Sequence, residues 1–408
     1  MSRCIVLGGS GAVGRHAVKT LSQFKDVSEL VIGDINLKEA NRLKSEINSD
    51  KISILNVNVE DKDAVKKVIK DFDIVLNCTG PFYKFVPIIL KAVIEQGINY
   101  VDICDDFDVT LKILEWDKEA KEADISALIG MGSSPGVTNI LAKFCADQLL
   151  DKVESVDIYH AHGGEPLEGK GVILHRIHCM ILKIPMFLDG ELKYVNYFGE
   201  DGIALQEEVE FHKIGRYKVY PYPHPEQITI PRYIKGIKRV TNKGTVLPEE
   251  YYNLIRDIVK IGLIGEEPID VNGCKIKPID FAIAYIINER DKILKKVNFG
   301  EQRGCVKVVV RGFKKNNPHT YIFQLASGGG QAMGEGTGIP AAMGTILMIR
   351  KKIKEKGIFP PERGVNPLNF LSLMQELLKI KKIGDESGGS PLIIESIDHT
   401  GKISRLTL

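Results

Sequence analysis

Short apolar runs alternate with longer amphipathic runs over the first third of the chain. The apolar runs predict parallel strands, since strands that are buried on both faces are almost continuously hydrophobic. The strands are expected over residues 4–7, 29–32, 52–56, 74–77, 100–103 and 125–129, with helices over 12–24, 37–48, 62–70, 86–96 and 107–124. The alternation predicts an α/β fold, in which a Rossmann-type doubly wound parallel sheet binds ligands at the carboxyl ends of its strands.

The pattern changes after about residue 153. Residues 153–162 alternate as a strand does, and the stretch up to about 322 is rich in Tyr, Pro and charged residues. It predicts a second, α+β domain with a mostly antiparallel sheet. Helices are expected over 249–261 and 278–287, and strands 306–313 and 321–325 should form a hairpin.

The glycine-rich stretch 326–340 predicts a flexible hinge. A second phosphate loop is not expected, because no suitable strand leads into the stretch and it has no Lys-Ser or Lys-Thr pair. A helix over 340–354 should follow, with Pro340 in its first turn, and a further helix over 369–378. We therefore expect residues 1–131 to form a dinucleotide-binding domain on which 337–408 packs back. Residues 132–336 should form a substrate-binding and dimerisation domain, which predicts a homodimer.

The composition narrows the class of protein. Apolar residues make up 44% and charged residues 26% of the 408 residues, and the formal net charge is +2. This balance is typical of a globular chain, and it gives no reason to expect nucleic acid or a membrane as a partner. No apolar run is long enough for a membrane span, and the strand pattern begins too early for a signal peptide to be expected.

The chain has seven cysteines, which is an odd number, and no two of them form a C-x-x-C pair. Both facts argue against a disulfide framework and against a thiolate zinc site. A reducing, cytoplasmic location is the expectation.

A glycine motif, G-x-G-x-x-G, links the first predicted strand to the first predicted helix. Its glycines would allow the tight turn, the approach of a pyrophosphate and close packing of helix on strand. A flexible turn is the alternative, but strand, glycine turn, helix, strand and acid follow in the order that a dinucleotide site requires. The predicted cofactor contacts are Gly9, Ser10, Gly11, Ala12, Val13, Gly14, Asp34, Asn58, Val59, Thr79, Gly80 and Pro81.

Asp34 ends the second strand, 20 residues after Gly14. A carboxylate there accepts hydrogen bonds from ribose hydroxyls and repels a 2′-phosphate, which favours NAD over NADP. NADP stays possible, because Lys38 or Arg42 could hold the phosphate. Asp34 could also cap the helix that follows.

Two rim positions are candidates for substrate chemistry. The turn around Ser134, at the end of the sixth strand, could hold a carboxylate or the nicotinamide, or could simply cap a helix. Asp102 ends the fifth strand and could bind an ammonium group or accept a proton, whereas Asp105 and Asp106 suit helix capping better.

The second domain contributes further candidates. Glu165 and His178 could act as general acid or base, and Arg176 could grip a substrate carboxylate, with Arg232 and Arg216 as substitutes. Histidines 160, 162, 175 and 178 lie close in sequence, but neither an acid nor a cysteine at ligand spacing completes a metal set. No metal is therefore predicted.

The order of short motifs resembles the saccharopine dehydrogenase family, in the branch of lysine 6-dehydrogenases and saccharopine-reductase-like enzymes. The motifs span nearly the whole chain, at residues 8–14, 77–82, 100–102, 134–139, 271–274 and 356–362. Saccharopine reductases typically carry an acid just before the Pro-Gly, where this chain has Ser134. The departure favours a deaminating or opine-like enzyme over one that acts on saccharopine.

The resemblance implies a nicotinamide-dependent oxidoreductase that acts on the C–N bond of an amino acid or opine-like substrate, with hydride transfer through an imine. The alternative is a non-catalytic NAD-binding regulatory or assembly protein on the same fold, since a fold does not fix a function. Convergence of Asp102, Glu165, Arg176 and His178 in one cleft would favour the enzyme.

Overall fold

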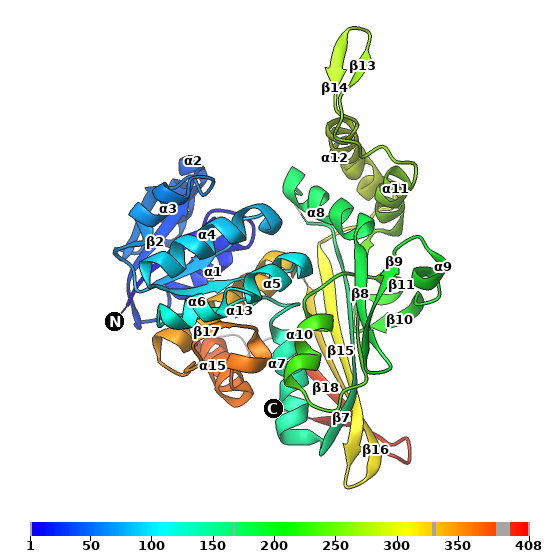
Figure 1. Ribbon diagram of the computed structural model, residues 1–408. Helices are drawn as coiled ribbons and strands as arrows, with labels where there is room; N and C mark the ends of the chain where they lie inside the picture. The colour runs from blue at the N-terminus through cyan, green and yellow to red at the C-terminus, as the bar shows by residue number, and fades with distance from the viewer. Residues whose placement is uncertain (1, 166–167, 329–331, 381–391, 407–408) are drawn as a thin grey trace.

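The structure is a computed structural model that describes residues 2–165, 168–328, 332–380 and 392–406. Two lobes lie side by side, the first built mainly from the N-terminal third of the chain (Figure 1). Within these described residues, its sheet has seven parallel strands. Their order across the sheet is β17 (Gly357–Phe359), β6 (Ser126–Leu128), β5 (Asn99–Asp102), β4 (Ile74–Asn77), β1 (Ser2–Leu7), β2 (Val27–Asp34), β3 (Ile52–Asn56).

The predicted Rossmann-type sheet is confirmed, and it gains a strand that the sequence pattern did not suggest. β17 comes from the last part of the chain and pairs with β6 through Ile358 and Ala127. The helices of the first lobe are α1 (Gly14–Leu21), α2 (Leu37–Ile47), α3 (Lys62–Ile69), α4 (Phe82–Gln96), α5 (Phe107–Leu114) and α6 (Asp117–Glu122). The single helix expected over 107–124 is therefore two helices.

In the part of the chain that the structure describes, the second lobe is built on a ten-stranded sheet. Its main path runs β10-β11-β12-β7-β15-β16-β18-β19, β8 pairs with β12, and β9 pairs with β8. All pairs are antiparallel except β12 with β7, so the expected mostly antiparallel sheet is confirmed. The strands are β7 (Lys152–Gly163), β8 (Lys183–Leu188), β9 (Glu191–Asn196), β10 (Glu207–Phe211), β11 (Gly215–Pro221), β12 (Arg239–Leu247), β15 (Arg303–Lys314), β16 (Asn317–Gly328), β18 (Leu392–Ile397) and β19 (Ile403–Leu406).

Helices cover this sheet and join it to the first lobe. They are α7 (Val137–Phe144, continued by a π turn, Cys145–Leu149), α8 (Lys170–Ile181), α9 (Glu200–Ile203), α10 (Glu226–Tyr233), α11 (Glu249–Lys260) and α12 (Pro278–Lys296). A small hairpin, β13 (Ile269–Val271) with β14 (Cys274–Ile276), stands out from the lobe beyond α12 (Figure 1).

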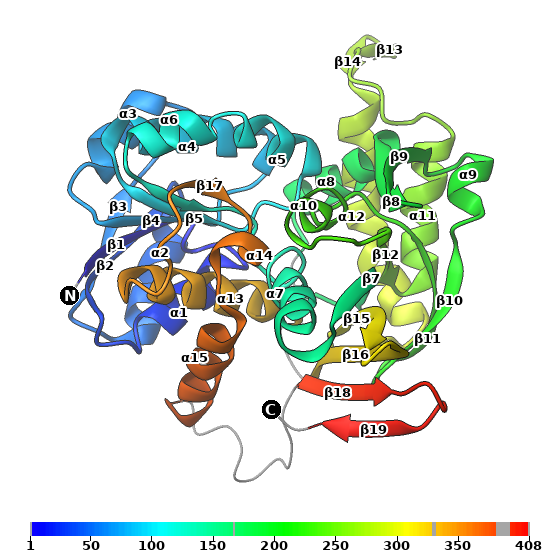
Figure 2. The same ribbon diagram turned by 60° about the horizontal axis from the view of Figure 1, so that its bottom comes forward.

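The last part of the chain divides between the lobes. α13 (Ala332–Ile349), α14 (Pro361–Gly364) and α15 (Pro367–Ile380) lie beside the first lobe, whereas β18 and β19 extend the second sheet (Figure 2). The segment expected to pack back, 337–408, thus does so only in part. α13 also begins before Pro340, so that residue lies inside the helix. The expected hinge covers residues 329–331, which lie outside the described residues.

Close packing explains why a glycine-rich stretch forms a helix here. A Cβ on Gly334 would lie 2.5 Å from the carbonyl oxygen of Ala12, and one on Gly338 would lie 2.6 Å from that of Val13. α13 can therefore approach the start of α1 only because these side chains are absent. Of the helices described, none is long and apolar enough to cross a membrane.

Candidate active site

The glycine turn between β1 and α1 has the form that a dinucleotide needs. A Cβ on Gly14 would lie 2.1 Å from the carbonyl oxygen of Gly8, so helix and turn pack too closely for any side chain there. Gly11 is different, because it is exposed and its Cβ would meet only the Gly8 oxygen, at 3.2 Å. Open space above Gly11, next to the start of a helix, suits a pyrophosphate.

The other predicted cofactor contacts surround this turn. Thr79 follows β4, and its Oγ1 would lie 2.9 Å from a Cβ on Gly8, so the loop after β1 and the loop after β4 are in contact. Gly80 and Pro81 continue the loop after β4. Asn58 and Val59 follow β3. Asp34 ends β2 and accepts hydrogen bonds from the amide and hydroxyl of Ser10.

Asp102 sits at the carboxyl end of β5 and is 0% exposed. Its Oδ1 accepts hydrogen bonds from the amides of Gly130, at 2.7 Å, and Cys104, at 3.1 Å. Its Oδ2 has no hydrogen bond of normal geometry among the residues described, and the buried hydroxyl of Tyr100 lies near enough to the carboxyl to limit the rise of its pKa. Burial raises the pKa of Asp102 to about 6, which suits proton exchange near neutral pH.

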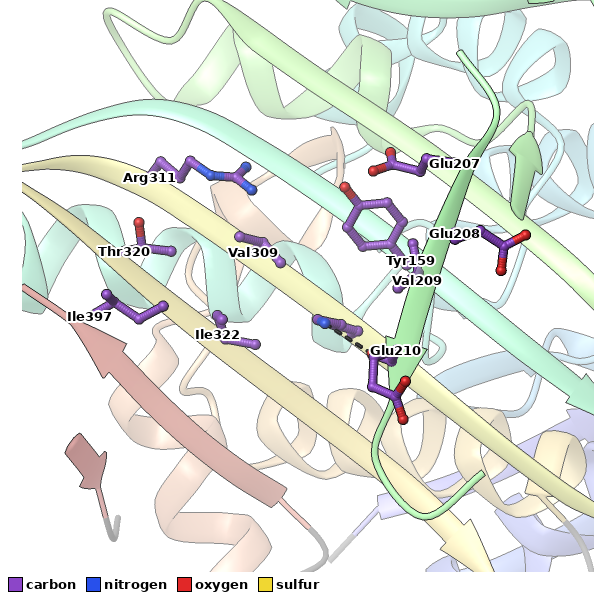
Figure 3. A pocket seen from close by; sticks show the side chains of 11 residues that line it. Tyr159, Glu207, Glu208, Val209, Glu210, Val309, Arg311, Thr320, Ile322 and Ile397 are labelled. Carbon is purple, nitrogen blue, oxygen red and sulfur yellow. Dashed lines mark hydrogen bonds between the residues drawn. The ribbon is translucent and has the colours of Figure 1, made fainter. Parts of the chain in front are cut away.

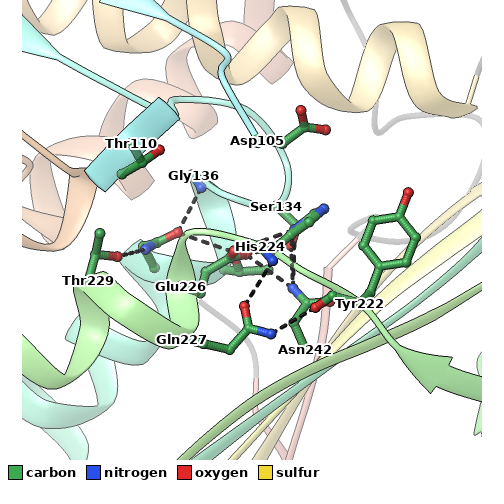
Figure 4. A network of polar contacts seen from close by, with 12 residues as sticks. Asp105, Thr110, Ser134, Gly136, Tyr222, His224, Glu226, Gln227, Thr229 and Asn242 are labelled. Atoms are coloured by element: carbon green, nitrogen blue, oxygen red, sulfur yellow. Dashed lines mark hydrogen bonds and ion pairs between the residues drawn. The ribbon is translucent and has the colours of Figure 1, made fainter. Parts of the chain in front are cut away.

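Ser134 anchors a buried polar cluster between the two lobes (Figure 4). Its hydroxyl donates to Glu226 at 2.5 Å and lies 3.3 Å from Nδ1 of His224, and Asn242 donates to it at 3.2 Å. Burial alone would raise the pKa of Glu226, but His224 and the bond from Ser134 outweigh it and hold that pKa below its usual value. A charged carboxylate therefore fixes the Ser134 hydroxyl.

Our sequence analysis did not identify His224, Glu226 or Asn242 as site residues. They come from α10, the loop before it and β12, about 90 to 108 positions after Ser134. The one local sign was the run Tyr-Pro-His-Pro-Glu at 222–226, in which prolines flank a histidine next to an acid.

α8 brings histidines of the second lobe to acids of the first. His175 Nδ1 lies 3.1 Å from Asp106, and its Nε2 lies 3.5 Å from Asp105. Burial opposes a charge on His175, but Asp105 and then Asp106 outweigh it, so the pKa of His175 lies well above its usual value. His178 lies 3.6 Å from Asp108 and stacks on Tyr83.

These groups are spaced closely enough for a metal ion to be considered. The sets are Asp105, Asp106 and His175, and Asp106, Asp108 and His178. Each histidine lies beside a carboxylate of the first lobe, so contacts between the lobes account for both groups. We assign no metal to them.

Glu165 and Arg176 lie in the second lobe, and each pairs with an oppositely charged or hydrogen-bonding side chain of the same lobe. Glu165 faces His162 at 2.7 Å; burial opposes its charge, but His162 outweighs burial and lowers the pKa of Glu165 to about 2. Arg176 is buried in an ion pair with Glu168, which also pairs with Arg290. The structure thus brings His178 to the first lobe, while Glu165 and Arg176 belong to a separate buried ionic group.

A cavity of about 310 Å³ lies elsewhere, on the second sheet (Figure 3). Three acids of β10 and the cations Lys307 and Arg311 line it, around an apolar floor that includes Val309 and Ile322. None of its lining residues belongs to the glycine turn or to the Ser134 cluster. The cavity is therefore separate from the candidate active site.

Two family models match almost the entire chain. Residues 4–128 match the saccharopine dehydrogenase NADP binding domain, and residues 132–382 match the saccharopine dehydrogenase C-terminal domain. The boundary between the two falls just before the turn that carries Ser134.

Full-length relatives are similar over most of their sequences. The chain is 22% identical to carboxyaminopropylagmatine dehydrogenase of Synechocystis sp., over 91% of this chain and 95% of that protein. It is 25% identical to carboxynorspermidine synthase of Vibrio cholerae, over 88% of each. The fold matches apo saccharopine dehydrogenase (L-Glu forming) of Saccharomyces cerevisiae with a TM-score of 0.64 and 19% identity, over 93% of this chain and 97% of that one.

Proposed function

Because this chain belongs to the saccharopine dehydrogenase family, a family of NAD(P)-dependent dehydrogenases, we propose that it oxidises or forms the C–N bond of an amino acid derivative. The observation that carries the proposal is the buried carboxylate oxygen of Asp102 at the carboxyl end of β5. It lies at the same edge of the sheet as the glycine turn and the Ser134 turn.

The residues present fit a nicotinamide dinucleotide. The exposed Gly11 leaves space for the pyrophosphate, and the fixed carboxylate of Asp34 can accept bonds from the adenosine ribose. When bound, the nicotinamide supplies the acceptor or donor of hydride. The protein must then hold the substrate carbon beside it and manage the proton of the substrate nitrogen.

We assign that proton to Asp102 Oδ2. Oxidation of a secondary amine to an imine releases the N–H proton, and a carboxylate whose pKa is about 6 can accept it at neutral pH. Asp102 is fully buried, so the protein must open around it to admit substrate and then close again. We assign the Ser134 hydroxyl, which donates its proton to Glu226, to accept a hydrogen bond from a polar group of the substrate.

The substrate we propose is an amino acid whose side-chain carbon is bonded to a nitrogen of a second compound, a cationic amine. The names of two relatives refer to such compounds, carboxyaminopropylagmatine and carboxynorspermidine. Charge supports the choice, because Asp105, Asp106 and Asp108 cluster near Asp102 at the start of α5. Asp105, whose side chain is 26% exposed, is more accessible to an ammonium group than the fully buried Asp102.

The test is an absorbance assay of the reduced nicotinamide. Carboxyaminopropyl derivatives of agmatine and of diamines are offered with NAD and with NADP, beside lysine and saccharopine. Reduction with the diamine derivatives and not with saccharopine supports the proposal. Dinucleotide binding without turnover of any compound would instead indicate a non-catalytic NAD(P)-binding protein.

A further inference from the structure

A buried chain of polar groups connects the last third of the protein to the turn that carries Ser134. Glu362, in α14, is 0% exposed, and its Oε2 accepts a hydrogen bond from Nδ2 of Asn139 at 2.9 Å. Oδ1 of Asn139 in turn accepts the amide hydrogen of Gly136 at 2.8 Å. Two segments that are distant in sequence therefore meet behind the turn.

We propose that Glu362 is a positioning residue, which through Asn139 fixes the backbone of the turn that presents Ser134 to the candidate active site. For its catalytic consequence this proposal rests on the proposed function. The structural part, that Glu362 holds the turn, stands without it.

The turn needs such support because its backbone is unusual. Gly136 has φ +128°, and a Cβ there would lie 2.0 Å from the carbonyl oxygen of Gly132. Further hydrogen bonds close the turn, from the amide of Gly132 to Pro135 and from the amide of Val137 to Gly132. If Asn139 rotated away, the buried amide of Gly136 would lose its acceptor. A buried donor without an acceptor destabilises the folded state.

Glu362 in turn determines which way Asn139 faces. Nδ2 of Asn139 has two acceptors in the part of the chain that the structure describes, Glu362 at 2.9 Å and Thr229 Oγ1 at 3.5 Å. The shorter bond is the one to the carboxyl group. Without it, the weak bond to Thr229 alone would hold the amide.

The carboxyl group can serve in its neutral form. Burial raises the pKa of Glu362 to about 7, and Glu226 of α10 is the charged neighbour that adds to this effect. Asn139 and Thr229, which contact the carboxyl from α7 and α10, are uncharged. Arg363 of α14 is committed to Glu355. Glutamine is therefore a close replacement, because its carbonyl oxygen can still accept from Asn139.

Hydrogen exchange tests the structural part without any substrate. Exchange of the Gly136 amide is measured in the wild type, in Glu362→Gln and in Glu362→Leu. The leucine variant should exchange about tenfold faster or more, and the glutamine variant should stay close to wild type. Asp157→Asn is the matched control, because it removes another buried carboxylate, one that pairs with Arg239 and Arg311 in the second sheet. Unchanged exchange in Glu362→Leu would overturn the proposal.

Kinetics test the catalytic part. Glu362→Leu should lower kcat about tenfold or more while the dissociation constant for the dinucleotide stays within about twofold, and Glu362→Gln should restore kcat. If Asp157→Asn lowered kcat as much as Glu362→Leu does, Glu362 would contribute only to general stability, and the proposal would be overturned. Should the leucine variant fail to fold, Glu362→Met is closer in volume and removes the same acceptor. If the Gly136 amide exchanged faster in Glu362→Leu but the wild type turned over no substrate, the proposed function would be contradicted. The proposal that Glu362 holds the turn through Asn139 would stand.

Discussion

Ser10 and Asp34 are joined by two hydrogen bonds to one carboxylate oxygen. The amide of Ser10 donates to Oδ2 of Asp34 at 2.9 Å, and its hydroxyl donates to the same atom at 2.6 Å. The amide of Asn36 donates to the other oxygen. The carboxylate is thereby held in one orientation beside the glycine turn, before any ligand arrives.

A fixed carboxylate at this place should select the coenzyme. We expect NAD to bind at least about tenfold more tightly than NADP, a difference of roughly 1.4 kcal/mol, because a 2′-phosphate would face Asp34. Calorimetric titration with both coenzymes measures this, and Asp34→Asn should reduce the ratio. The reverse order of affinities would show that Lys38 or Arg42 holds the phosphate.

Gly11→Val should abolish dinucleotide binding and leave folding nearly intact. The new side chain would point into open space and occupy the volume that the pyrophosphate needs. Gly14→Ala is the contrasting variant, since its Cβ would collide with the backbone of Gly8 and impair folding itself. Thermal unfolding and calorimetry together separate the two effects. Unchanged NAD affinity in Gly11→Val would contradict the cofactor assignment.

Asp102→Asn should lower kcat for amine oxidation about 100-fold or more, since proton transfer by a positioned group contributes on that order. In the wild type the activity should fall as pH drops through about 6, because the carboxylate then holds a proton and cannot accept another. Asp105→Asn is the comparison and should mainly raise KM. Loss of kcat in Asp105→Asn alone would move the proton acceptor to that residue.

Arg176→Ala should destabilise the protein more than it affects KM. From sequence we expected Arg176 to grip the substrate carboxylate, but it is buried against Glu168. Breaking a buried ion pair costs on the order of 3 kcal/mol, which chemical denaturation can measure. Arg232→Ala, at an exposed position, should change stability by no more than about 0.5 kcal/mol. A raised KM with unchanged stability would restore the original interpretation.

Glu362 should make the protein less stable as pH rises. The folded state holds the proton up to about pH 7, whereas the unfolded chain releases it near the ordinary pKa of 4.5. The folded state therefore binds more protons between these values, and the free energy of unfolding falls across that window. Glu362→Gln should flatten this part of the profile. Denaturant midpoints at pH 5, 6, 7 and 8 give the comparison, and identical slopes would contradict it.

The sequence predicted the first sheet well because its signals are local. An apolar strand, a glycine turn and an acid after the next strand each act within a few residues, and β3 and β4 agree with their predicted bounds. β17 was not predicted because three residues carry too little pattern, and pairing with β6 is what makes Gly357–Phe359 a strand.

α8 and α13 show where local patterns fail. α8 has no clear polar face, because His175 and His178 meet the first lobe while Ile173 and Ile177 enter the core. The glycines of α13 led us to predict a hinge from the sequence, but the helix needs them in order to pack closely at the start of α1. The Ser134 cluster likewise depends on tertiary contacts, which a single sequence does not reveal. The homodimer stays a prediction.

The placement of α13 and β17 has a consequence for how the protein is made. The core of the first lobe includes Ala341, Met343 and Ile346 of α13 together with Val6 and Leu128, and its sheet is complete only when β17 pairs with β6. During synthesis the N-terminal third therefore leaves the ribosome with an open apolar face and an unpaired strand edge. It must remain in that state while more than two hundred further residues are translated. Chaperones that shield nascent chains should matter more here than for a Rossmann domain that closes on its own.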